Sequence, residues 1–168
     1  KRNTLSLLYK VCVRSTVEYG LVLYWNNLKQ TEAARIRQIQ YRGARIVTGA
    51  LPFTSQSKLE SDLALETFDD RYKFLGLTIF HKIHLGLTRP LIQTCMPQIN
   101  TNNTRGAGCY ILPRFTRISY KNSFFPFFSK LWSQLSKTTR NERDVLLFKD
   151  KLRLLYKPKK TKTLQLWG

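Results

Sequence analysis

Acidic side chains are scarce in this 168-residue chain, which has 10 Asp and Glu against 29 Lys and Arg and a formal net charge of +19. The excess rises along the chain, since residues 1–100 carry 14 basic and 7 acidic side chains and residues 101–168 carry 15 and 3. Self-repulsion on this scale disfavours a compact domain without a partner. The imbalance therefore predicts a polyanionic partner, most commonly nucleic acid. An anionic membrane surface is the alternative, but it is normally met by one basic amphipathic helix.

Long apolar runs and paired cysteines are also missing. The longest apolar run, residues 21–25, is far shorter than the ~18 residues of a membrane span, so we expect no membrane association. Lys10 and Arg14 interrupt the apolar residues near the start, which excludes a signal-peptide pattern, and a start at Lys1 indicates a piece of a larger protein. The 3 cysteines are far apart and odd in number. They predict free thiols in a reducing intracellular compartment, with no metal ion and no cofactor.

The residues that are present predict a mainly α protein, a helical bundle with a short β-strand or hairpin near residues 109–118. Apolar residues are 42% and aromatic residues 12% of the chain, which is too rich for a disordered segment. Helical spacing extends over residues 5–19, 31–48, 67–85, 124–135 and 142–156. Thr31 and Thr67 are the expected N-caps, and Gly20 and Gly49 are the expected helix ends. Residues 110–118 alternate in character instead.

A change of composition suggests two lobes. Residues 98–108 are dominated by Asn, Thr and Gly, which predicts a linker. We therefore expect a helical lobe over residues 1–97, a second, mainly helical lobe over residues 109–157, and a basic tail over residues 158–168.

The helix expected after Thr31 carries a column of basic side chains. Arg35, Gln38, Arg42 and Arg45 recur at spacings of three and four, roughly 110° around the axis from an apolar stripe. That stripe, expected to face the core, is formed by Ala33, Ile36, Ile39, Gly43, Ile46 and Val47. A guanidinium fork matches phosphate oxygens bidentately, so the column is a candidate nucleic-acid contact. The alternative is a solvated basic face on an ordinary core helix.

A second basic patch is expected near the end of the chain. Lys149, Arg153 and Lys157 recur four residues apart, and Lys159 and Lys160 follow in the tail. These side chains are predicted to contact the same polyanion.

Other motifs favour structural roles over chemistry. Asp69 and Asp70 suggest a polymerase metal pair, but Thr67 and Asp70 have capping-box spacing. His81 and His84 lie one turn apart without further ligands, which favours partly buried, hydrogen-bonded histidines. The aromatic stripe of Phe124, Phe128 and Trp132 suits base stacking or a protein partner, yet its helical spacing favours core packing. No nucleophile or phosphate-loop motif is present, so this chain alone is predicted not to be an enzyme.

An ordered set of short segments resembles a known family. Residues 8–10 read LYK, residues 17–20 read VEYG, Trp25 follows, and residues 36–49 read IRQIQYRGARIVTG. Later landmarks are LETFDDR at 65–71, TRG at 104–106, SF at 123–124, LWSQL at 131–135 and FK at 148–149. In order and spacing they resemble the region after the catalytic palm in non-LTR (LINE-type, jockey-like) retrotransposon reverse transcriptases. Tyr41 departs from the pattern, since the family usually has a basic residue there, and Ser136 stands in place of a proline.

The resemblance implies a thumb and post-thumb segment, with residues 1–97 as the thumb-like lobe, that grips template RNA and primer duplex. The parent protein would be an RNA-directed DNA polymerase, but its palm and metal-binding carboxylates are absent from this chain. The expected partners are RNA or DNA backbone and the rest of such an enzyme, in the nucleus or a ribonucleoprotein particle. The alternative is a co-opted structural RNA-binding subunit of a ribonucleoprotein such as a ribosome.

Overall fold

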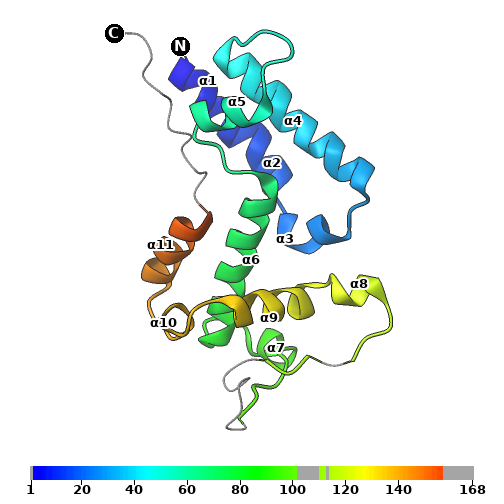
Figure 1. Ribbon diagram of the computed structural model, residues 1–168. Helices are drawn as coiled ribbons and strands as arrows, with labels where there is room; N and C mark the ends of the chain where they lie inside the picture. Colours follow the sequence, from blue (N-terminus) through cyan, green and yellow to red (C-terminus); the bar gives the residue numbers. More distant parts are fainter. Residues whose placement is uncertain (1, 102–109, 113, 157–168) are drawn as a thin grey trace.

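The computed structural model describes residues 2–101, 110–112 and 114–156, and it is mainly helical, as predicted (Figure 1). Its elements are α1 (Arg2–Leu8), η1 (Tyr9–Arg14), α2 (Ser15–Glu18), α3 (Leu21–Tyr24), η2 (Trp25–Asn27), α4 (Gln30–Thr48), α5 (Gln56–Asp62), α6 (Phe68–His84), α7 (Pro90–Thr94), α8 (Ile118–Lys121), α9 (Phe124–Gln134), α10 (Lys137–Arg140) and α11 (Val145–Tyr156). No helix within these ranges combines the length and apolar composition that crossing a bilayer requires.

The strand or hairpin expected near residues 109–118 is not supported by the part of that segment that the structure describes. Its only pairing there is an isolated antiparallel bridge between Ile99 and Tyr110, next to a bond from the Ile111 N–H to the Gln98 carbonyl at 2.7 Å. Tyr110 is buried against Phe80, with ring centroids 5.2 Å apart. The alternating polar and apolar residues here thus reflect the packing of one aromatic ring, Tyr110, and not a β-ladder.

Local signals place most helix ends as expected. Thr67 caps α6, because its Oγ1 accepts from the Asp70 N–H at 3.1 Å. The Gly20 and Gly49 residues have φ values of +70° and +69°, which other residues rarely adopt. The N-cap expected at Thr31 is wrong: α4 begins after Lys29, whose backbone N–H donates to the Glu32 carboxylate at 2.9 Å.

The first helical run passes through a π-helical turn. α1, η1 and α2 follow one another without a break, and the run ends before Gly20, as the apolar spacing predicts. Within η1, Tyr9 and Arg14 are both buried and lie five positions apart, a spacing that matches the wider π winding.

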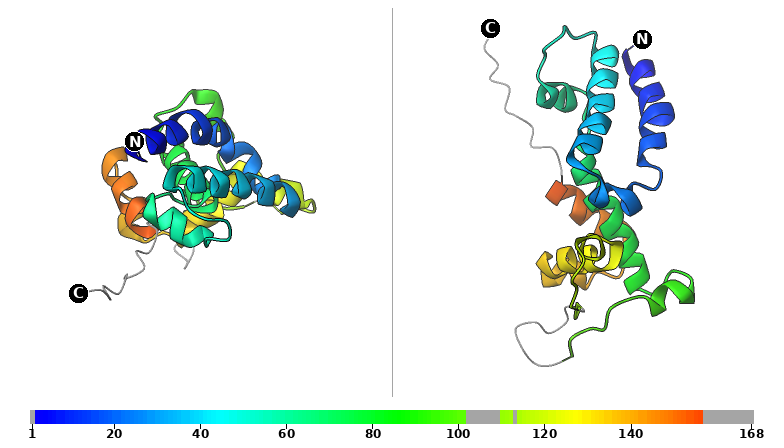
Figure 2. Two further views of the ribbon diagram at one scale, coloured as in Figure 1. Left: turned by 90° about the horizontal axis from the view of Figure 1, so that it is seen from above. Right: turned by 90° about the vertical axis from the view of Figure 1, so that its right-hand side faces the viewer.

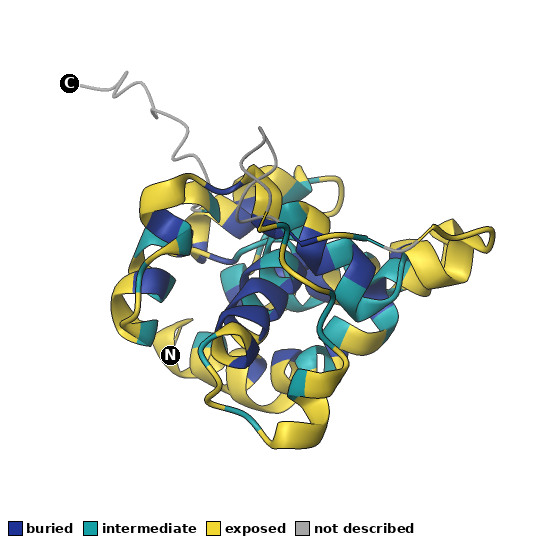
Figure 3. Cartoon of the chain, turned by 90° about the horizontal axis from the view of Figure 1, so that it is seen from below, coloured by how far each residue is buried: buried dark blue, intermediate teal, exposed yellow. Residues whose placement is uncertain are grey.

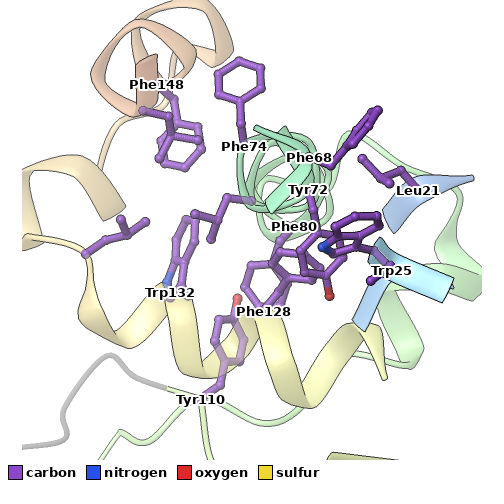
Figure 4. Close-up of a cluster of buried hydrophobic side chains, with 14 residues drawn as sticks. Leu21, Trp25, Phe68, Tyr72, Phe74, Phe80, Tyr110, Phe128, Trp132 and Phe148 are labelled. Atoms are coloured by element: carbon purple, nitrogen blue, oxygen red, sulfur yellow. The ribbon is translucent and has the colours of Figure 1, made fainter. Parts of the chain in front are cut away.

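The central element is α6, with α3, α9 and α11 packed around it (Figures 1 and 4). Phe128 and Trp132 of α9 are 0% and 1% exposed, so the prediction that this aromatic stripe is core is confirmed. Buried residues gather in the middle of the molecule, and the outward faces of the peripheral helices are exposed (Figure 3). One hydrophobic cluster contains buried residues from both predicted lobes, among them Phe80 and Phe128. The division into lobes stays a prediction.

Two helix crossings depend on glycine. A Cβ on Gly76 of α6 would lie 1.9 Å from Cζ of Phe128. A Cβ on Gly43 of α4 would lie 2.2 Å from Cε2 of Tyr9, whose ring belongs to a smaller cluster that joins η1, α4 and α5. Each aromatic ring therefore rests directly on the backbone of the helix that it crosses.

Replacing Gly76 by alanine should destabilise the protein by ~1–3 kcal/mol through overpacking. Alanine otherwise favours a helix by about 1 kcal/mol over glycine, so a net loss would be evidence for the crowding. The measurement is urea unfolding of Gly76→Ala, alone and combined with Phe128→Leu, which makes room for the methyl group. As a control, Lys82→Ala at an exposed position of α6 should change stability by no more than about 0.5 kcal/mol. A Gly76→Ala protein as stable as the parent would contradict the close contact.

Candidate nucleic-acid interface

The inward face of α4 differs from the one that the sequence pattern predicted. Ala33, Gln40, Ala44 and Val47 are buried, whereas Ile39 and Ile46 are 43% and 73% exposed. The expectation that both isoleucines are core residues is therefore wrong. A polar residue takes part in the buried face because Gln40 Nε2 donates to Glu60 Oε1 at 2.7 Å and to the Glu66 carbonyl at 3.3 Å.

Most of the predicted basic column is open to solvent. Arg35, Gln38 and Arg42 are exposed on α4, whereas Arg45 is partly buried and lies over the Tyr41 ring, 5.7 Å from its centroid. Within the described ranges, none of the three arginines forms an ion pair with a carboxylate. The column thus presents unneutralised charge, most of it from Arg35 and Arg42.

Other arginines near α4 are neutralised. Arg37 on the same helix donates to Asp69 Oδ2 at 2.9 Å and lies 5.4 Å from the Trp25 ring centroid. Arg14 and Arg71 both bind the Glu18 carboxylate, at 2.6 and 3.0 Å. The scarce carboxylates therefore pair with arginines that join elements of the fold, and the outer face of α4 receives none.

The second predicted patch is less open and lies elsewhere. Lys149 is partly buried, and Arg153 binds Asp150 Oδ1 at 2.7 Å, with both side chains more than half exposed. Lys157, Lys159 and Lys160 lie outside the described residues. α11 lies beside α6, whereas α4 lies beyond the N-terminal end of α6 (Figures 1 and 2), so the two patches are on separate elements that are not neighbours.

The acidic pair next to Thr67 has a structural role, as its capping-box spacing predicts. Asp70 Oδ2 accepts from the Thr67 hydroxyl at 2.8 Å, and Asp69 Oδ1 accepts from Trp25 Nε1 at 3.1 Å. In the described part of the chain, no three His, Cys, Asp or Glu residues are grouped closely enough to hold a metal ion. Cys12 and Cys95 are free and exposed.

The two histidines differ in burial. His84 is the more exposed of the two, but its ring packs on Tyr110 and Trp132, with centroids 6.0 and 5.1 Å away. Its Nδ1 lies 2.6 Å from the Tyr110 hydroxyl, so the prediction of a hydrogen-bonded histidine is confirmed. His81 is fully buried and stacked on Phe148, with ring centroids 3.9 Å apart. Its Nε2 donates to the Glu142 carbonyl at 2.7 Å, and Nδ1 has no partner. Burial lowers the pKa of His81, because a second proton would sit on the unpartnered Nδ1.

This environment predicts that stability depends on pH through His81. In the unfolded chain this side chain has a pKa near 6.5, whereas its pKa in the folded protein is lower. Below about pH 6.5 the unfolded state therefore binds more protons than the folded state, and the free energy of unfolding should fall as the pH drops. His81→Gln, which keeps an amide donor for Glu142, should flatten that dependence. The measurement is urea unfolding between about pH 5 and pH 8, with Lys82→Gln at an exposed position of α6 as the control. Burial lowers the pKa of His84 as well, so His84→Gln should flatten the dependence in the same direction. The same slope in the parent and in His81→Gln would refute the assignment.

Comparisons with protein-family models, with curated proteins and with solved structures give no match for this chain. Its function therefore has to be argued from the geometry of its own residues.

Proposed function

We propose that this chain grips the sugar–phosphate backbone of a nucleic acid through the outer face of α4. The observation that carries the proposal is the exposure of Arg35, Gln38 and Arg42 on one face, with no carboxylate paired to either arginine in the described ranges. The net charge of +19 supplies the long-range attraction for a polyanion.

The spacing of the column suits phosphates. Arg35 and Arg42 are seven residues apart, which is ~10.5 Å along an α-helix. One strand of B-DNA places a phosphate every ~3.4 Å of its axis, so two such arginines span about three phosphates. Guanidinium groups bind phosphate oxygens bidentately, and contacts of this kind give affinity and register without reading the base sequence.

The resemblance to retrotransposon reverse transcriptases supports template RNA and primer duplex as the nucleic acid, gripped by a thumb and post-thumb segment. Lys149 and Arg153 would make a separate contact, because they lie on α11, which is not a neighbour of α4. A protein with this role would act in the nucleus or in a ribonucleoprotein particle.

A co-opted structural subunit of a ribonucleoprotein is the second proposal, favoured by the same open basic face. Sequencing the full reading frame separates the two. An aromatic-x-Asp-Asp palm motif encoded upstream supports the reverse transcriptase, and stable ribosome association without such a palm supports co-option.

Neutralising one arginine of the column should weaken binding in a salt-dependent way. For Arg35→Gln or Arg42→Gln, the slope of log K against log[salt] should shrink by roughly 0.7–0.9, because one counterion fewer is released. The loss should be similar for unrelated sequences, since no base edges are read. The measurement is a fluorescence anisotropy titration at several salt concentrations with single-stranded RNA and with DNA duplex.

Lys82→Gln is the matched control, because it removes the same charge from an exposed position on α6. Its salt slope should stay at the parent value. Melting temperatures of all three variants should stay close to that of the parent, since solvent-facing changes rarely exceed ~0.5 kcal/mol. Unchanged salt slopes in both arginine variants would contradict the proposal and would mean that Arg35 and Arg42 are solvated and do not contact the nucleic acid.

Polymerase activity should be absent from the isolated chain. Primer extension needs metal-binding carboxylates, and the Asp69–Asp70 pair is occupied by helix capping and by Trp25 and Arg37. The test is primer extension with Mg²⁺ and dNTPs on highly purified protein. Extension that is lost in Asp69→Asn would overturn this prediction.

A further inference from the structure

An open apolar groove of about 540 Å³ runs between the N-terminal helical run and α4. Leu5 and Leu8 form one wall and Ile39 and Ile46 the other, and all four side chains are more than 40% exposed. The two helical segments lie side by side (Figure 2, right). Contiguous exposed apolar surface of this kind on a folded protein marks an interaction site.

Contacts to a phosphate backbone do not explain this groove. Phosphates are bound by charge and hydrogen bonds, and they would leave Leu5, Leu8 and the two isoleucines in water. The groove therefore calls for an apolar occupant in addition to any anion on the basic column.

The groove also has a charged rim. Arg42 lines it, and no Asp or Glu is among the residues that line it. Arg35, two turns earlier on the same face of α4, is exposed and has no ion-pair partner in the described ranges either. An occupant would thus meet an apolar floor with the cationic Arg42 at its edge and Arg35 further along the same face of α4.

We infer that this groove docks an amphipathic helix of a partner protein, with an apolar stripe flanked by carboxylates. A third helix fits the hollow between two adjacent helices by ridge-into-groove packing, and its carboxylates complement Arg42, for which they would compete with a phosphate backbone. A second copy of this chain is disfavoured, because a two-fold interface would set one basic column against the other. A lipid surface is disfavoured because the site is concave.

The probe is a synthetic, dye-labelled helix of about 20 residues, ~30 Å long, with leucines at i, i+3, i+4 and i+7 and glutamates on both flanks. One control peptide has the same composition with the leucines dispersed around the helix, and another has lysines in place of the glutamates. Binding to the full chain is measured by fluorescence anisotropy. We expect the glutamate-flanked helix to bind at least about tenfold more tightly than either control, a difference of ~1.4 kcal/mol.

Variants locate the binding surface. Ile46→Glu should weaken binding of the glutamate-flanked helix by about tenfold or more, through lost apolar contact and added repulsion. Leu154→Glu is the matched control, since Leu154 is 71% exposed on α11 and Ile46 is 73% exposed on α4. Arg42→Glu should reverse the preference, so that the lysine-flanked helix becomes the tighter ligand. Melting temperatures confirm that each variant folds.

Cysteine alkylation provides a footprint independent of the label. Cys12 lines the groove, and both Cys12 and Cys95 are free and exposed. A docked helix should slow iodoacetamide modification of Cys12 and leave Cys95 unchanged, as read by peptide mass spectrometry.

Equal binding of the glutamate- and lysine-flanked helices would overturn the inference, as would equal effects of Ile46→Glu and Leu154→Glu. Protection of Cys12 by RNA or by vesicles of phosphatidylserine, without protection by the peptide, would assign the groove to nucleic acid or to a membrane instead. Concentration-dependent protection of Cys12 in the chain alone would assign it to a second copy.

Discussion

The close approach of α9 to α6 at Gly76 is the constraint on which the rest of the fold depends. With no side chain at this position, the Phe128 ring lies against the backbone of α6 and reaches Tyr72 at a centroid distance of 5.2 Å. The same packing brings Trp132 to Phe80 at 5.4 Å. His81 then connects α6 to Phe148 of α11, so one series of rings joins three helices that are distant in sequence.

Most carboxylates near α4 and α6 are paired, whereas the excess of positive charge on the outer face of α4 is unpaired in the described ranges. Glu18 serves two arginines and Asp69 receives Arg37 and Trp25, so the few carboxylates hold elements together. Pairs as exposed as Arg37–Asp69 add little stability, roughly 0–1 kcal/mol each. Arg35, Arg42 and other exposed cations of the described residues repel one another, which is why a bound polyanion or acidic helix would stabilise the folded chain.

Sequence patterns predicted what is decided locally. Thr67 marks the start of α6 and Gly49 the end of α4, as predicted, because a side-chain oxygen and a missing Cβ act within one helical turn. Sequence patterns were not sufficient for Ile39 and Ile46. Which face of α4 is buried depends on the Glu60 carboxylate and the Glu66 carbonyl that accept from Gln40 Nε2, and these belong to α5 and the loop after it. The exposure of Arg35 and Arg42 followed from spacing, but the partly buried position of Arg45 depends on its neighbour Tyr41 and on tertiary packing.

The π-helical turn η1 sets the register of the N-terminal helical run against α4. A π turn holds about one residue more than an α turn, and one residue corresponds to a rotation of ~100° around a helix axis. Rewinding η1 as a regular α-helix would therefore rotate α1, and with it Leu5, Leu8 and Tyr9, relative to α2. If Arg14 kept its bond to the Glu66 carbonyl, these groove residues would turn away from α4. The alignment of the two groove walls thus depends on the winding of six residues, Tyr9–Arg14, and deleting Val11, which does not line the groove, would change the surface without removing any residue that lines it.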